Sequence, residues 1–125
     1  METYCYCKSG LSFTTCCEPF LLKHKAPALP VALMRSRYTA YVLHNAAYLM
    51  QTTHPSQRHY YSKKEILNWA KNNTWLKLEI LTAKETIVEF KAYYLDEKNQ
   101  AQVHHEKSTF QLENGIWYYL DGEFY

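Results

Sequence analysis

The chain has 125 residues, of which 47% are apolar and 21% are charged, a composition typical of one soluble globular domain. No apolar run approaches the ~20 residues of a membrane span, and the N-terminal stretch METYCYCKSG lacks the apolar core of a secretory signal. We therefore expect a cytoplasmic protein without a membrane span, whose thiols stay reduced.

The charge is spread unevenly along the chain. Residues 1–75 hold nine Lys or Arg and three Asp or Glu, whereas residues 76–125 hold five and nine, so the first part is basic although the net charge is only +2. A basic first part is compatible with an anionic partner such as RNA. No dense Lys/Arg run occurs, however, and a solvated helical surface explains the same charges more simply.

All four cysteines lie in one stretch, CYCKSGLSFTTCC at residues 5–17. Cys5-x-Cys7 followed by Cys16-Cys17 gives four thiolates close in sequence, which suits tetrahedral Zn²⁺. A complete Cys₄ set leaves no open coordination position, so we predict structural rather than catalytic zinc. Two alternatives stay open. Disulfides are disfavoured by the tight spacings, and free thiols would pack as small apolar residues.

The first predicted helix covers residues 31–44, after a proline-containing connector, HKAPALP at 24–30. Apolar side chains recur on one face at spacings of three and four, and Arg35 and Thr39 fall on another face. We therefore predict an amphipathic helix. The apolar set is Met34, Tyr38, Tyr41 and Val42.

Two further helices are predicted at 46–53 and 62–73. Pro55 follows the first one closely and stops it. The second begins at a capping box, with Ser62 as N-cap and Glu65 three residues later.

The second half of the chain changes to the period of two that is typical of half-buried strands. In the first strand Leu76, Leu78 and Ile80 share one side, and a bulge is predicted near Lys107, where the alternation blurs. Three helices followed by a four-stranded meander predict an α+β fold, with a cone of helices packed on one face of a curved antiparallel sheet. The predicted strands cover residues 76–81, 86–95, 101–112 and 116–124, with turns at 96–100 and 113–115.

The cysteine stretch resembles the SEC-C motif, a zinc-binding element named after the C-terminus of the translocase ATPase SecA. Its pattern is C-x-C-G-S-G, an aromatic residue, then C-C or C-H. Lys8 replaces the usual glycine and Tyr6 stands where proline is common, but neither change removes a ligand. The matching positions are Cys5, Cys7, Ser9, Gly10, Phe13, Cys16 and Cys17.

Four further stretches resemble the YchJ-like family of bacterial proteins, so the resemblance covers nearly the whole chain. It implies an N-terminal SEC-C zinc element at residues 1–25, joined to a nuclear-transport-factor-2-like (cystatin-like) domain at 26–125. It implies no particular reaction. The stretches are ALMRSRYTAYV (32–42), THPS (53–56), HHEKSTF (104–110) and WYYLDG (117–122).

A fold of this shape often encloses a pocket between its helices and its sheet. Either Arg35 or Arg37 can enter such a cone and hold an anion or pair with Glu106. Adjacent strand residues point to opposite faces, so His105 and Glu106 cannot form a simple acid–base pair with each other. Core packing or a surface role is the ordinary alternative for each candidate. The pocket candidates are Arg35, Tyr41, His54, Tyr94, His105, Glu106, Trp117, Tyr119 and Asp121, the last three of these sharing one strand face.

We favour the hypothesis of a binding or adaptor module, in which the closed zinc knuckle docks a protein partner or an RNA. The alternative is a small enzyme of the hydrolase, isomerase or dehydratase type, acting in the cone. A homodimer is a further expectation, because sheets of this type often pair through an exposed face.

Overall fold

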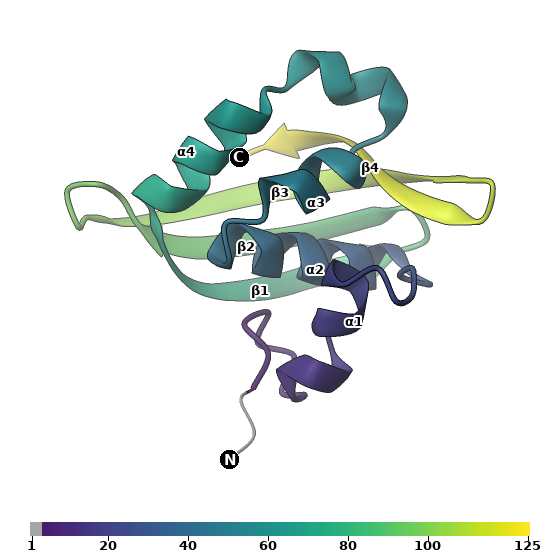
Figure 1. The fold of residues 1–125 in the computed structure, drawn as a ribbon. Coiled ribbons are helices and arrows are strands. Elements are labelled where there is room, and N and C mark those ends of the chain that lie inside the picture. The colour runs from purple at the N-terminus through teal and green to yellow at the C-terminus, as the bar shows by residue number, and fades with distance from the viewer. Residues whose placement is uncertain (1–3) are drawn as a thin grey trace.

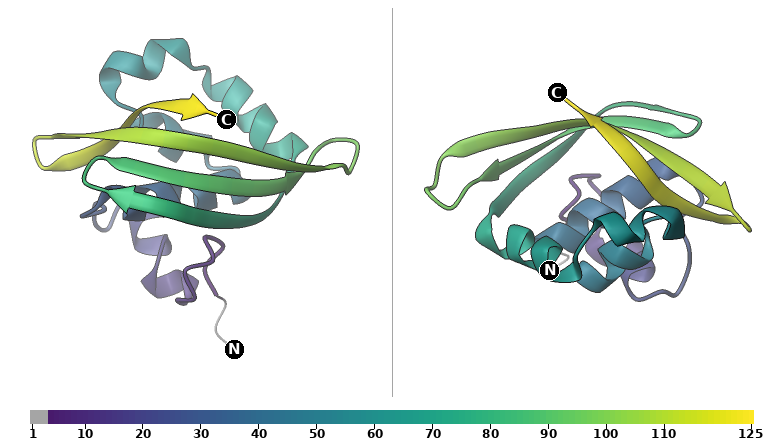
Figure 2. Two further views of the ribbon diagram at one scale, coloured as in Figure 1. Left: turned by 180° about the vertical axis from the view of Figure 1, so that it is seen from behind. Right: turned by 90° about the horizontal axis from the view of Figure 1, so that it is seen from above.

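A four-stranded antiparallel sheet forms one layer of the molecule and the helices form the other (Figure 1). The structure is a computed structural model that describes residues 4–125. The sheet bends, and Figure 2 shows the helices gathered on its concave side. This arrangement confirms the predicted α+β fold. The strands lie in the order β1 (Thr74–Lys84), β2 (Ile87–Leu95), β3 (Ala101–Glu113) and β4 (Ile116–Phe124).

The three predicted helices are present, within two residues of their expected bounds. A fourth helix, α1 (Glu18–Leu21), directly follows the cysteines, and its four residues are too few for a periodic pattern to reveal it. Among residues 4–125, no helix combines the length and apolar character that crossing a membrane requires. The other helices are α2 (Pro30–Val42), α3 (Ala46–Gln51) and α4 (Lys63–Asn72), with 3₁₀ turns η1 (Phe13–Thr15) and η2 (Pro55–Tyr60).

Local side chains fix where the helices begin. The Asn45 side chain accepts a hydrogen bond from the Tyr48 backbone N–H at 3.0 Å and so caps α3. Ser62 Oγ accepts one from the Glu65 N–H at 3.3 Å, which confirms Ser62 as the N-cap of α4. The prolines at the starts of α2 and η2 lack an N–H that a first turn would leave unbonded.

Helix α2 is buried on nearly all sides, so the prediction of an amphipathic helix is wrong. Its second face, which carries Arg35 and Thr39, is covered by the cysteine segment, and Thr39 is fully buried. Three of the cysteines therefore belong to the main hydrophobic core. The buried members of that core are Cys5, Cys7, Cys17, Leu33, Met34, Tyr38, Leu78, Val88, Phe90, Ala92, Phe110 and Tyr119.

Irregularities in β1 and β4 change which side chains face the helices. In β1 the register skips Leu76, which is exposed, while Leu78 and Ile80 keep facing inward. The bulge expected near Lys107 is absent there, because β2 and β3 pair without a shift through that residue. The shift in this half of the sheet lies in β4 instead, at Leu120.

We expect Leu33→Ala in α2 to lower the free energy of unfolding by about 2–5 kcal/mol, because it empties a fully buried position. Leu29→Ala is the matched control, since Leu29 lies four residues earlier and is 60% exposed. It should change stability by no more than about 0.5 kcal/mol. Urea unfolding measures both, and equal losses would contradict the assigned core.

Candidate metal centre and cone cavity

The cysteine knuckle, residues 4–17, is a tight backbone loop followed by a 3₁₀ turn. The Cys5 N–H donates to the Leu11 carbonyl at 2.8 Å, and the Lys8 N–H donates to the Cys5 carbonyl at 3.1 Å. Lys8 has φ 64° and Gly10 has φ 88°, both in the left-handed region that favours glycine. This explains why the SEC-C pattern carries glycine at the position of Lys8. The lysine adopts the conformation at some cost.

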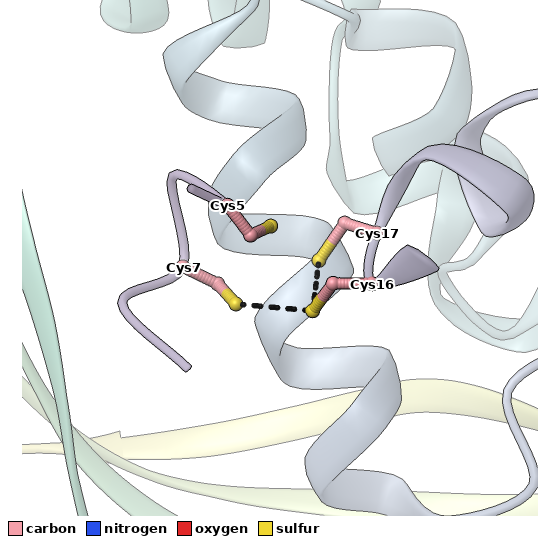
Figure 3. A group of neighbouring side chains, drawn as sticks. All are labelled: Cys5, Cys7, Cys16 and Cys17. Carbon is pink, nitrogen blue, oxygen red and sulfur yellow. Dashed lines mark hydrogen bonds between the residues drawn. The ribbon is translucent and has the colours of Figure 1, made fainter. Parts of the chain in front are cut away.

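The four cysteine sulfurs point into one small space (Figure 3), with Cys5 and Cys7 on one segment and Cys16 and Cys17 on the other. All four Sγ atoms lie within 4.8 Å of one another. Cys16 Sγ is 3.6 Å from Cys7 Sγ and 3.9 Å from Cys17 Sγ. A tetrahedron with Zn–S bonds of ~2.3 Å has edges of about 3.8 Å. The thiols are free of disulfides and can hold a metal ion.

Polar groups around the sulfurs suit a metal–thiolate unit, which carries negative charge. Arg35 Nη1 donates to the Cys7 carbonyl at 2.9 Å and lies 3.9 Å from Cys7 Sγ. Ser9 Oγ is 3.2 Å from Cys16 Sγ, and Thr39 Oγ1 is 3.9 Å from Cys5 Sγ. A nearby cation and hydroxyl donors stabilise coordinated thiolates. The pocket candidate Arg35 thus lies at the knuckle and not among the residues that line the cone.

Without a metal, the thiols do not ionise together. Burial raises the pKa of Cys16 to about 11. Hydrogen bonds from Cys17 and Cys5 lower the pKa of Cys7, whereas hydrogen bonds with Cys5 and Cys7 raise the pKa of Cys17. The Cys7 thiolate is thereby stabilised, while Cys16 and Cys17 are held in the protonated form. Four thiolates in this space require a cation, which agrees with the donor set.

A cavity of about 390 Å³ lies between the sheet and helices α2 and α4. Its walls are mainly aromatic, and a short row of polar groups crosses the floor formed by β3. Trp69 and Trp75 stack with their ring centres 5.2 Å apart at one end. The aromatic lining residues are Tyr38, Tyr41, Tyr60, Tyr61, Trp69, Trp75, Phe90, Tyr119 and Phe124, and the polar ones include Arg37, Thr53, His104, Glu106 and Ser108.

Glu106 is the centre of the polar row and is only 6% exposed. His104 Nε2 lies 2.8 Å from Oε1, while Ser108 Oγ and Tyr119 OH donate to Oε2 at 2.6 and 2.8 Å. Burial alone raises the pKa of Glu106, but these hydrogen bonds outweigh burial and the pKa lies below its ordinary value. Glu106 is therefore an ionised carboxylate at neutral pH.

The ionised carboxylate also orients its neighbours. A carboxylate only accepts hydrogen bonds, so His104 donates from Nε2 to Glu106. Burial raises the pKa of Tyr119, which keeps its hydroxyl protonated as a donor. Gly122 on β4 faces Glu106, and a Cβ at that position would collide with the carboxylate. The glycine is what allows Glu106 to lie against β4.

Three of the nine pocket candidates, Tyr41, Glu106 and Tyr119, line the cavity. Asp121 does not, because the register shift at Leu120 turns it to the outer face of the sheet, opposite Thr109. The expectation that Trp117, Tyr119 and Asp121 share one face is therefore wrong for Asp121.

The remaining candidates have structural contacts. His54 Nδ1 caps η2 by accepting from the Ser56 N–H, and its Nε2 lies 3.1 Å from a Glu113 oxygen without the alignment of a hydrogen bond. His105 contacts Glu89 at 2.7 Å on the outer sheet face, opposite to Glu106 as expected. Trp117 Nε1 donates to the Ala28 carbonyl. Tyr94 packs against the Trp69–Trp75 pair.

The list of pocket candidates lacks two lining residues: Arg37, which the sequence offers as an alternative to Arg35, and His104, which the sequence offers as an alternative to His105. The strand alternation itself places His104 on the same face as Glu106, so that signal was present. Predicting whether Arg35 or Arg37 enters the cavity requires knowing which side of α2 the cysteines cover. The sequence of the helix alone does not contain that information.

The comparisons with known proteins agree with this architecture. The family model described as "YchJ, middle NTF2-like domain" matches residues 29–122. The chain belongs to this family. Similar curated members are UPF0225 proteins from Haemophilus influenzae (strain PittEE) and Serratia proteamaculans (strain 568). The Haemophilus protein is 43% identical, and the match covers 94% of this chain and 76% of the relative. The Serratia protein is 40% identical, and the match covers 98% of this chain and 84% of the relative.

Two solved structures of SEC-C motif containing proteins are also similar to this family member. RPA3114 from Rhodopseudomonas palustris has a TM-score of 0.88 at 36% identity, covering 95% of this chain and 96% of its own. The protein from Psychrobacter arcticus has a TM-score of 0.76 at 30% identity, covering 94% and 80%. The knuckle followed by a nuclear-transport-factor-2-like cone is thus shared with these proteins.

We expect Glu106→Gln to lower the free energy of unfolding by about 1–3 kcal/mol at neutral pH, because an amide cannot accept all three hydrogen bonds. The folded-state pKa lies below the unfolded value of about 4.3. The carboxylate's contribution is therefore present above the unfolded pKa and is lost as the pH falls through the folded one. Urea unfolding at a series of pH values should show the gap to wild type shrinking in acid.

The matched control is Glu89→Gln, which changes a partly exposed carboxylate that pairs with a histidine on the outer face. Its effect should stay below about 1 kcal/mol. A Glu106→Gln gap of the same size at neutral and acid pH would contradict the assignment of a stabilised carboxylate.

Proposed function

We propose that this protein is a zinc-stabilised binding protein that holds a small organic molecule in its cone cavity. The observation that carries this proposal is the cavity itself. Its volume of about 390 Å³ falls in the range of about 300–1,000 Å³ that is usual for small-molecule sites. Aromatic walls around a few ordered polar groups are also the usual composition of such sites.

Zn²⁺ is the metal we propose for Cys5, Cys7, Cys16 and Cys17. All-sulfur donors with near-tetrahedral separations favour zinc, and a full Cys₄ set makes its role structural. The Cys7 and Cys17 side chains are fully buried in the main core, so the metal would join the knuckle to helix α2. We also propose that residues 1–25 form the SEC-C-like zinc-binding element and residues 26–125 the nuclear-transport-factor-2-like domain. The two parts share one core.

Purified protein should contain about one zinc per chain by elemental analysis. Cys7→Ser should lower the melting temperature and release the metal, because structural zinc contributes directly to the free energy of folding. Thr14→Ala, an exposed change in the same knuckle, is the control and should leave both unchanged. A metal-free protein with the full melting temperature would contradict the zinc proposal.

Ligand binding in the cone is tested with two aromatic probes of equal size, 2-naphthoate and 2-naphthamide. Titration into ¹⁵N-labelled protein should shift backbone amide signals of cavity-lining residues for at least one probe. Ala92→Phe fills the cavity floor from β2 and should weaken binding at least about tenfold, since the ring occupies the ligand's space.

The control for this experiment is Val103→Phe, which adds the same ring on the exposed outer face of β3. It should leave the titration unchanged. If neither probe shifts cavity signals at millimolar concentration, or if both variants act equally, the proposed small-molecule site is wrong.

Two other functions have specific support. A small enzyme in the cone is supported by the His104–Glu106 pair, since an imidazole oriented by a carboxylate is a common general base. Docking of a protein partner by the knuckle is supported by apolar side chains exposed around it, with Tyr4 73% exposed and Leu11 and Leu22 each about half exposed. The RNA alternative, the homodimer and the cytoplasmic location rest on the sequence arguments alone.

A further inference from the structure

Arg37 has hydrogen-bond donors that the protein itself does not use. Its Nη1 donates to the Leu49 carbonyl at 3.0 Å and to the hydroxyls of Thr52 and Thr53 at 2.6 and 3.4 Å. A guanidinium carries five N–H groups. Within residues 4–125 Nε and Nη2 have no hydrogen-bond partner, so the Nε–H and both Nη2–H groups are free, and two of these three lie on one edge of the guanidinium.

The free edge belongs to a cation that is only 7% exposed. Arg37 forms no ion pair with a carboxylate in the described part of the chain. Its guanidinium carbon lies 4.5 Å from the centre of the Tyr119 ring, a cation–π contact that offsets only part of the cost of burial. Buried charges are usually paired with an opposite charge, and the Arg37 guanidinium lacks such an anionic partner.

Free donors on Arg37 have access to the cavity. Over the described residues, only His54 Nε2 is a fully buried side-chain nitrogen or oxygen without a hydrogen-bond partner. Nε and Nη2 of Arg37 are therefore not fully buried, and Arg37 lines the cavity, so we infer that these two atoms face it. A molecule in the cavity can accept from both atoms.

Glu106, the other charged group deep in the cavity, does not serve as the missing partner. Its two oxygens already accept from His104, Ser108 and Tyr119. It also limits the charge of the ligand. One negative charge neutralises Arg37, whereas a dianion such as a phosphate monoester would leave excess negative charge beside Glu106. A monoanion is favoured.

We propose that the ligand of the cone cavity is a carboxylate with an aromatic or other planar apolar body. Its two oxygens accept from Nε–H and Nη2–H of Arg37, the side-on bidentate geometry that guanidinium and carboxylate share. Its body lies against the stacked Trp69–Trp75 wall. This inference rests on the proposed small-molecule function and adds the charge and the anchoring residue.

The test compares 2-naphthoate with 2-naphthamide by isothermal titration calorimetry on the wild-type protein. The two probes match in shape, and the amide lacks the charge and the second acceptor. The carboxylate should bind at least about tenfold more tightly, the ratio expected for one charged hydrogen-bonded pair. A smaller ratio overturns the inference even where both probes bind in the cavity. Failure of both probes overturns the proposed function as well.

Arg37→Gln should bring the two affinities within about twofold of each other, whereas Arg58→Gln should preserve the tenfold ratio. Arg58 is a matched control because it also donates to carbonyls at the end of α3 but does not line the cavity. If Arg37→Gln fails to fold, the Arg37 Nε–H signal in ¹⁵N spectra of the wild-type protein tests whether Arg37 contacts the ligand. It should shift with 2-naphthoate and stay in place with 2-naphthamide, and the absence of that difference overturns the assignment of Arg37.

Discussion

Burial of helix α2 on opposite sides is the constraint on which both candidate sites depend. Successive residues of an α-helix turn by about 100°, so Arg35 and Arg37 point in nearly opposite directions. Arg35 reaches the carbonyl of Cys7 in the knuckle, and Arg37 lines the cavity beside the Tyr119 ring. One short element therefore positions a cation for each site. The helix has little freedom to move without disturbing both.

This arrangement gives the cysteine knuckle a role in forming the cavity. Helix α2 contributes Met34, Arg37, Tyr38 and Tyr41 to the cavity lining, while its other side packs under the cysteines. If the knuckle opened, the sulfur-facing side of α2 would be exposed to water, including the fully buried Thr39. We infer that a metal at the knuckle stabilises the cone as well as the N-terminal segment. The cavity's chemistry is then carried by residues that do not touch the metal.

Sequence patterns captured the parts of the structure that local chemistry determines. The cysteine spacing predicted a group of four sulfurs, which the structure brings together, and the alternation of apolar residues predicted the four strands and their meander order. They also placed Glu106 and His105 on opposite faces, as the structure has them. These features depend on neighbours within a few residues.

Features set by tertiary packing were not predictable in the same way. One extra residue at Leu120 reverses the alternation of β4 and sends Asp121 to the outer face, and nothing in the local composition marks that position. The prediction that α2 is amphipathic was wrong because the cysteine segment covers the face that would otherwise be exposed to water. The assignment of the cavity cation to Arg37 depended on the same fact.

Native-state hydrogen exchange of α2 backbone amides, with zinc bound and after chelation, measures most directly whether the knuckle supports the cavity. If α2 couples the two sites, chelation should speed exchange throughout residues 33–42 as well as in the knuckle, because the helix loses the packing on one whole side. Faster exchange confined to residues 4–21, with α2 as protected as before, would show that the cone holds its shape independently of the metal and would contradict the coupling.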